Sequence, residues 1–79
     1  MAKFPVDAPR DRVMQAFERL GFHFVRGGNH IAMSRDNSDG TSTPLTMPNH
    51  RTLKSSTLRT ILTQIRVTRD DFLEALDNA

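Results

Sequence analysis

Apolar positions near the start of the chain follow a helical pattern. The spacing i, i+1, i+4 and i+7 forms one stripe, which consists of Val13, Met14, Phe17 and Leu20. Pro9 suits the first turn of a helix, where its missing N–H is not needed, and Gly21 is a common helix stop. The pattern predicts a helix over about residues 9–20.

The next part of the chain changes to the alternation that is typical of β-strands. Residues 22–25 and 30–35 alternate between two faces, and the glycine pair Gly27-Gly28 between them indicates a tight hairpin turn. Residues 43–47 are predicted to form a third short strand, in which Pro44 indicates an edge position or an irregular start. We therefore predict three antiparallel strands in sequence order.

Alternation within the second predicted strand separates two sets of side chains. Ile31 and Met33 share the face that we expect to point into the core, whereas His30, Ala32 and Ser34 share the other face. An antiparallel sheet of this kind needs one face covered, and the other face can stay open to solvent. His30 is therefore expected on the open face, which is the first structural reason to consider it functional.

The clearest amphipathic pattern follows a polar connector over residues 49–55. The apolar side chains of this helix recur at i, i+3, i+4 and i+7, at Leu58, Ile61, Leu62 and Ile65. Ser55 or Ser56 is expected to cap its start. A last helix is predicted after Thr68, because Asp71 three residues later resembles a capping box.

The order of these elements defines the expected fold class. It is α+β, with the order α-β-β-β-α and a short C-terminal helix, in one domain over residues 1–79. We expect the helices on one face of the three-stranded antiparallel sheet.

Composition excludes several classes of chemistry. The 79 residues contain no cysteine, which excludes disulfides, thiolate metal sites and cysteine nucleophiles. No apolar run approaches the roughly 18 residues of a membrane-spanning helix, and nothing resembles a signal peptide. We therefore expect a soluble, cytoplasmic protein.

The charge is mildly basic and unevenly distributed. The formal net charge is +2, and residues 51–69 carry basic but no acidic side chains. Six of the nine acids gather around Asp36 and Asp39 and near the C-terminus. A one-sided basic surface suits the phosphate backbone of RNA, although a solvated helix face would have the same composition.

Three motifs, in order along the chain, resemble those of one family. Residues 21–30 (GFHFVRGGNH) resemble the glycine–phenylalanine, arginine and glycine–serine–histidine signature of HicA-type toxins. Pro48-Asn49-His50 resembles the family's proline–x–histidine, and residues 53–62, ending in STLRTIL, resemble its lysine–glycine–threonine–leucine–arginine–x–isoleucine–leucine helix. Phe72 matches the family's terminal aromatic residue, so the likeness runs over about residues 13–76.

This resemblance implies a fold, an activity and a partner. The implied fold resembles the double-stranded-RNA-binding domain, which agrees with the α-β-β-β-α order. The implied activity is that of an mRNA interferase toxin, an endoribonuclease that arrests growth, and the implied partner is a HicB-type antitoxin. The histidine at the position of His30 is the family's catalytic residue. The sequence departs from the family at Asn29, where serine is usual, and at Ser56, where glycine is usual.

The chemistry of RNA cleavage suits a histidine. RNA carries its own nucleophile, the 2′-OH beside each phosphate, so an enzyme must remove that proton and help the leaving oxygen depart. Histidine suits this role because its unperturbed pKa is about 6.5. His30 is the candidate general base, and His50 is the candidate acid or an RNA contact. No metal or other cofactor is required in principle.

The candidate RNA contacts are cationic side chains and the start of the second long helix. They are Arg26, Arg51, Lys54, Ser56, Thr57 and Arg59. Free N–H groups at a helix start favour a phosphate, although Ser56 and Thr57 could serve only to cap the helix. Arg59 could equally cap a helix or pair with an acid on another element.

Two other functions remain open from sequence alone. One is a non-catalytic RNA-binding domain that recognises A-form shape and 2′-hydroxyls. The other is a protein-interaction module whose working surface binds an antitoxin or regulator, which includes an inactive toxin homologue that acts through protein partners. A zinc site is not expected, because His30 and His50 lie 20 residues apart with no paired spacing and no cysteine.

Overall fold

The computed structural model describes residues 4–78, which form a mixed α+β arrangement. The elements in chain order are β1 (Asp7–Pro9), α1 (Arg10–Arg19), β2 (His23–Arg26), β3 (His30–Asp36), β4 (Ser42–Pro48), β5 (Thr52–Lys54), α2 (Ser55–Ile65) and α3 (Arg69–Asp77). The sheet β2-β3-β4 is three-stranded and antiparallel, and β1 and β5 form a separate pair. The predicted fold class is confirmed, and the β1–β5 pair is an addition to it.

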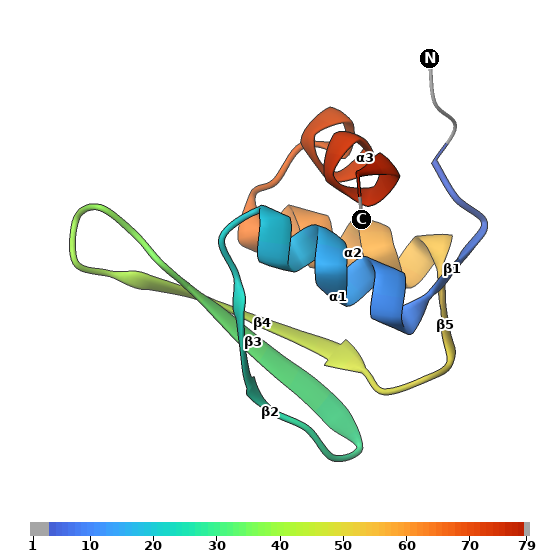
Figure 1. The fold of residues 1–79 in the computed structure, drawn as a ribbon, viewed down its shortest axis with the longest axis horizontal. Coiled ribbons are helices and arrows are strands. Elements are labelled where there is room, and N and C mark those ends of the chain that lie inside the picture. The colour runs from blue at the N-terminus through green and yellow to red at the C-terminus, as the bar shows by residue number, and fades with distance from the viewer. Residues whose placement is uncertain (1–3, 79) are drawn as a thin grey trace.

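The three-stranded sheet is built around β3, which pairs with β4 along its whole length. The register runs from His30 opposite Pro48 to Asp36 opposite Ser42. β4 lies at an edge of the sheet, which is where Pro44 is tolerated, as the sequence predicted. Figure 1 shows the β3–β4 hairpin extending to one side, past the ends of the helices.

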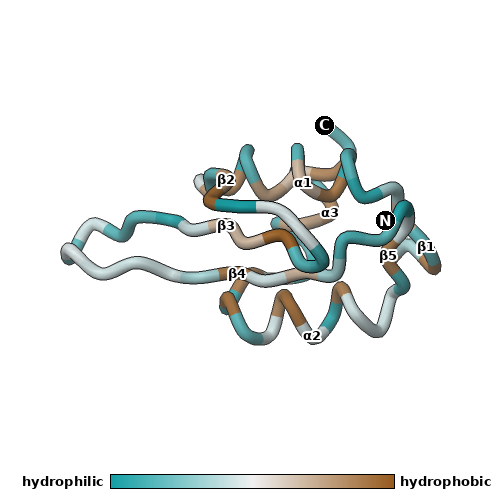
Figure 2. Tube along the Cα trace, turned by 90° about the horizontal axis from the view of Figure 1, so that it is seen from below, coloured by the Kyte–Doolittle hydropathy of each residue, from teal (hydrophilic) through white to brown (hydrophobic). Residues whose placement is uncertain are grey.

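The helices lie on one side of this sheet. In Figure 1 all three helices lie above the strands, and the view from below in Figure 2 places α1 near β2 and α2 alongside β4. α2 packs on β4, and α3 packs on α1. Phe17 lies at the centre of the core, with its ring centroid 6.0 Å from that of Phe22 and 5.5 Å from that of Phe72. The opposite face of the sheet is left uncovered.

The predicted helices are present with small changes at their starts. The helix predicted over residues 9–20 is α1, and Pro9 immediately precedes it as the last residue of β1 rather than lying in its first turn. α3 begins as predicted, because the backbone N–H of Asp71 donates to Oγ1 of Thr68 at 3.1 Å. None of the helices described is long and apolar enough to span a membrane.

The polar connector predicted over residues 49–55 contains a strand that the sequence analysis missed. β5 pairs with β1, with Leu53 opposite Ala8, and these two side chains are buried. A three-residue strand offers too little alternation to be recognised from its pattern.

The predicted cap of α2 is wrong. The N-cap residue is Lys54, whose extended backbone continues β5 directly into the helix, and no side chain caps the first turn. The backbone N–H of Ser55 donates instead to the carbonyl of Val6 at 2.8 Å. The β1–β5 pair, rather than a serine side chain, therefore fixes where α2 begins.

Candidate functional site

His30 is the first residue of β3 and lies at the end of the sheet formed by the β2–β3 turn and the β4–β5 connector. We call this end, residues 27–30 and 48–51, the site end. His30 is exposed, while Ile31 and Met33 are buried, so His30 points to the face that the helices leave uncovered. Gly28 in the preceding turn has φ of +122°, a backbone conformation that favours glycine.

Arg26 reaches the same face as His30 because of an irregularity in β2. Phe24 pairs with Met33, but Arg26 pairs with Ala32, so the register shifts by one residue between them. Paired residues in antiparallel strands point to the same face, and Ala32 shares the face of His30. Without the shift, strict alternation would have placed Arg26 on the face of Phe24. The bulge therefore turns a cation toward the face that carries His30.

The β4–β5 connector is attached to the turn that precedes His30. The backbone N–H of Asn49 donates to the carbonyl of Asn29 at 3.1 Å, and Nδ2 of Asn49 donates to the carbonyl of Gly28 at 2.8 Å. His50 follows directly in the chain and is exposed. The fold thus brings the segments that carry His30 and His50 to the same end of the sheet.

A shallow hollow of about 450 Å³ lies beside this connector. Its lining consists of Pro48, His50, Arg51, Thr52, Leu53, Lys54 and Thr57. Four of the predicted site residues therefore share one concave surface: His50, Arg51, Lys54 and Thr57. A hollow with an imidazole, two cationic side chains and a hydroxyl is suited to a phosphate group.

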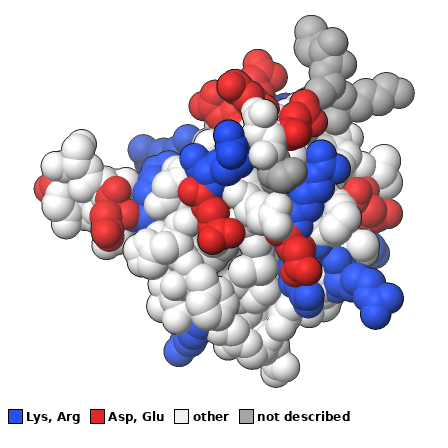
Figure 3. All heavy atoms as spheres, viewed as in Figure 1, with Lys and Arg blue, Asp and Glu red and all other residues white. Residues whose placement is uncertain are grey.

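Arg26, Arg51 and Lys54 form no ion pair within residues 4–78, where the ion pair found is Arg10 with Asp11. No acidic residue occurs in residues 19–35 or 40–69, which contain β2, β4, β5 and α2. Figure 3 agrees for the face it shows, since no Asp or Glu appears in its lower part, below the helices. Asp7 of β1, which pairs with Lys54 of β5, is an acidic residue that the fold places beside these elements. An anionic backbone that approaches this end therefore meets an excess of cations, although not a surface free of carboxylates.

Arg59 and Ser56 stand apart from this cluster. Thr57 and Arg59 are two residues apart on α2, so they project from opposite flanks of the helix. The guanidinium of Arg59 lies 5.4 Å from the ring centroid of Phe4, beside a second hollow that Arg69 also lines. Ser56 is exposed in the first turn of α2 and does not line the first hollow.

Comparison with known proteins identifies the family. The model of a family described as the HicA toxin of bacterial toxin–antitoxin systems matches residues 10–67, well over half of the 79-residue chain. The chain belongs to the HicA toxin family. No curated protein sequence matches it.

The HicA match includes every residue proposed for the site. It begins at Arg10, the first residue of α1, and ends just after α2. It therefore spans the three-stranded sheet and its site end, whereas α3 lies beyond it. The resemblance inferred from the motifs is confirmed at the level of the family, and membership implies an antitoxin as partner.

Asn49 at the site end of this HicA-family chain, and Arg10 of α1, which contacts it, were missed from sequence. Asn49 lies inside the proline–x–histidine motif, where only its neighbours were singled out. Nη1 of Arg10 donates to Oδ1 of Asn49 at 2.8 Å, and the 39 positions between them leave no sequence signal for the contact. The only sequence signal for a role of Asn49 was that a polar residue stands between Pro48 and His50. Among residues 4–78, no group of three His, Asp or Glu side chains is placed to hold a metal ion.

Proposed function

We propose that this protein is an endoribonuclease toxin, an mRNA interferase that acts in the cytoplasm and cleaves RNA without a metal. The observation that carries the proposal is the position of His30. It lies exposed on the uncovered face, shares that face with Arg26, and lies at the same end of the sheet as the hollow that His50 lines. Family membership supports the toxin role.

In the proposed reaction His30 is the general base. It takes the proton of a ribose 2′-OH, and the 2′-oxygen forms a bond to the adjacent phosphorus. The bond between phosphorus and the 5′-oxygen of the next nucleotide breaks, and that oxygen takes up a proton, for which His50 is the candidate donor. A positioned base or acid typically contributes about 10²–10⁴-fold to the rate.

The cations at the site end have a separate role in this proposal. Arg51 and Lys54 hold the phosphate in the hollow and offset the negative charge that develops on it. Thr57 contributes its hydroxyl, and the backbone N–H groups in the first turn of α2 face the phosphate. Arg26 contacts the RNA backbone on the uncovered face of the sheet. Ser56 and Arg59 remain proposed contacts for flanking nucleotides, outside the hollow.

The deciding experiment is RNA degradation in excess chelator. The unaltered chain, His30→Ala and His23→Ala are compared on one in vitro transcribed mRNA. His23 is a matched control, because it is an exposed histidine of the same sheet, paired with Ser34. We expect cleavage by the unaltered chain and by His23→Ala, and a loss of roughly 10²-fold or more in His30→Ala.

Binding separates catalysis from contact. The affinity for an RNA with 2′-deoxy substitutions, which lacks the nucleophile, should change little in His30→Ala. A parallel loss of binding and cleavage would make His30 a contact rather than a base. Binding without cleavage by the unaltered chain would overturn the nuclease proposal in favour of an RNA-binding domain.

We further propose that the protein partner is a HicB-type antitoxin. The support is membership in a family of toxin–antitoxin systems. The test is co-expression with the product of the adjacent gene, which should co-purify with this chain and suppress RNA cleavage. Cleavage that continues in the purified complex would contradict this assignment.

A further inference from the structure

Asn49 links the two backbone segments that carry His30 and His50. Its backbone N–H donates to the carbonyl of Asn29, and its side-chain Nδ2 donates to the carbonyl of Gly28, at 3.1 and 2.8 Å. Both acceptors lie within two residues before His30, and His50 is the next residue after Asn49. Asn49 therefore extends the junction of the two histidine-bearing segments beyond the last pair of the β3–β4 ladder, His30 with Pro48.

Arg10 fixes the orientation of the Asn49 amide. Its Nη1 donates to Oδ1 of Asn49 at 2.8 Å, which leaves the Nδ2 side of the amide directed to Gly28. The backbone N–H of Arg10 also donates to the carbonyl of Arg51 at 2.8 Å. The first residue of α1 thus holds the chain on both sides of His50.

We propose that Asn49, oriented by Arg10, is a positioning residue that sets the separation of His30 and His50. The inference rests on the proposed ribonuclease function and extends it to residues that do not touch the reacting atoms. Acid and base on separate segments work together only when their spacing is fixed, and a misplacement of about 1 Å can cost about 10²-fold in rate.

The far end of the same sheet supplies a matched control. There Nδ2 of Asn37 donates to Oγ1 of Thr41 and of Thr43, at 3.1 and 3.0 Å, and Nε of Arg35 donates to Oδ1 of Asn37 at 3.3 Å. Asn37 and Asn49 therefore use their amides in the same way, each with an arginine as donor. Only Asn49 makes its bonds next to the histidines: its acceptor Asn29 precedes His30 and His50 follows Asn49, whereas Asn37 lies seven positions after His30.

The first test compares Asn49→Ala with Asn37→Ala. kcat and KM are measured on one transcribed mRNA in excess chelator, Kd on the 2′-deoxy-substituted RNA, and Tm on each variant. We expect kcat of Asn49→Ala to fall roughly 10–100-fold, with KM and Kd within about twofold of the unaltered chain. Asn37→Ala should keep kcat within about twofold at a comparable loss of Tm.

A second variant separates positioning from stability. Asn49→Asp keeps an acceptor for Arg10 but loses the donor to Gly28, so its carboxylate faces a carbonyl oxygen. We expect kcat to fall as in Asn49→Ala, while the pairing with Arg10 preserves Tm. Arg10→Gln should also lower kcat, although less than Asn49→Ala does. Arg35→Gln is its matched control at the far end and should leave kcat within about twofold.

The outcomes distinguish this inference from the function on which it rests. No cleavage by the unaltered chain would overturn both. Cleavage at the normal kcat by Asn49→Ala or Asn49→Asp would overturn the positioning role alone. An equal fall of kcat in Asn37→Ala would also overturn it, because the loss would then follow general stability.

Discussion

At each end of the three-stranded sheet an asparagine amide forms hydrogen bonds, but the sequence separation of its partners differs between the two ends. At the far end Asn37 bonds to residues two, four and six positions away. At the site end Asn49 bonds to Gly28, 21 positions away, and to Arg10, 39 positions away. Local bonds stabilise a loop that could close by itself. Long-range bonds fix the relative position of segments that are far apart in the chain, here the β2–β3 turn, the β4–β5 connector and α1.

The two ends also differ in their attachment to the core. Ile31 and Met47, which pair with each other next to the site end, are buried. Toward the far end the last buried pair is Met33 with Leu45, and the hairpin then continues past the helices. In Figure 2 this extension is pale to teal, which marks polar residues. The site end is therefore attached more closely to the buried core, as a catalytic constellation requires.

The largest difference should come from lengthening each end. Two glycines inserted between Gly27 and Gly28 would shift His30 against the connector, so we expect cleavage to fall roughly 10²-fold or more. The same insertion between Ser38 and Asp39 should leave cleavage within about twofold, because longer surface loops cost little free energy. RNA cleavage rates and Tm are the measurements.

This comparison fails if both insertions reduce cleavage alike at similar Tm. Such a result would mean that the far end also takes part in the reaction or in RNA binding. An unfolded site-end variant would be replaced by one with a single inserted glycine at the same position.

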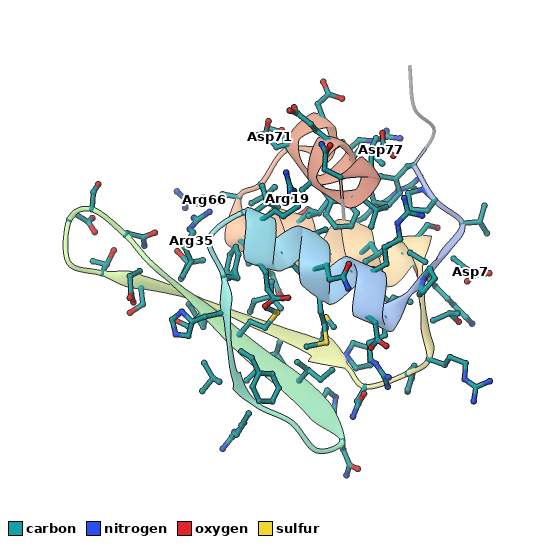
Figure 4. The ribbon with its side chains drawn as sticks, viewed as in Figure 1. Asp7, Arg19, Arg35, Arg66, Asp71 and Asp77 are labelled. Atoms are coloured by element: carbon teal, nitrogen blue, oxygen red, sulfur yellow. The ribbon has the colours of Figure 1, made fainter. Side chains whose placement is uncertain are left out.

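A smaller effect should come from removing cations. Arg51→Ala and Lys54→Ala should each weaken binding of the 2′-deoxy-substituted RNA by roughly 3–10-fold and lower the salt dependence by about one phosphate contact. Arg66 is the matched control, because it is an arginine that does not line the hollow. It is the C-cap residue of α2 and lies near Arg35 in Figure 4. Arg66→Ala should change the affinity by less than about twofold.

Arg59 sharpens this comparison. It lies on the opposite flank of α2 from Thr57, over Phe4. A loss of affinity in Arg59→Ala as large as that in Arg51→Ala would mean that RNA continues around α2. An equal loss in Arg66→Ala would instead indicate binding by overall charge, without a defined path.

Periodic features of the sequence were enough to predict most of the fold. The apolar stripes of α1 and α2 and the alternation of β3 extend over whole elements, so the position of His30 on the uncovered face followed from Ile31 and Met33 alone. The β1–β5 pair was missed because each strand has three residues. The N-cap of α2 was misassigned for the same reason, because the β1–β5 pair determines where α2 begins.

The candidate site was predictable as residue types but not as an arrangement. Motif likeness selected His30 and His50, and charge and placement selected the cations. A one-residue bulge nevertheless decides the face of Arg26, and strict alternation gives no sign of it. The role of Asn49 depends on contacts with the turn and with α1, which are far away in the chain. Such contacts exist only once the sheet and the helix have packed together.

The smallest predicted effect is a response to acid confined to the far end. The hydroxyl of Thr41 donates to Oδ1 of Asp39 at 2.6 Å and its backbone N–H donates at 2.9 Å, and these bonds hold the pKa of Asp39 below its ordinary value. A lowered pKa means that the carboxylate stabilises the folded loop above the ordinary value of about 3.9, and that this contribution is lost as pH falls through the lower folded value.

In NMR spectra recorded as the pH falls below about 3.9, the Thr41 amide should therefore shift and exchange faster. Asp39→Asn, which keeps an acceptor without a titrating group, should abolish this change. The bonds from Asn49 to Gly28 and Asn29 join amides to carbonyls, so the amides of Gly28 and Asn29 should not follow the Asp39 titration. Changes in step with Thr41 would show that the two ends are coupled through β3. Independent behaviour would mean that the site end keeps its geometry while the far loop opens, which is the property that a fixed separation of His30 and His50 demands.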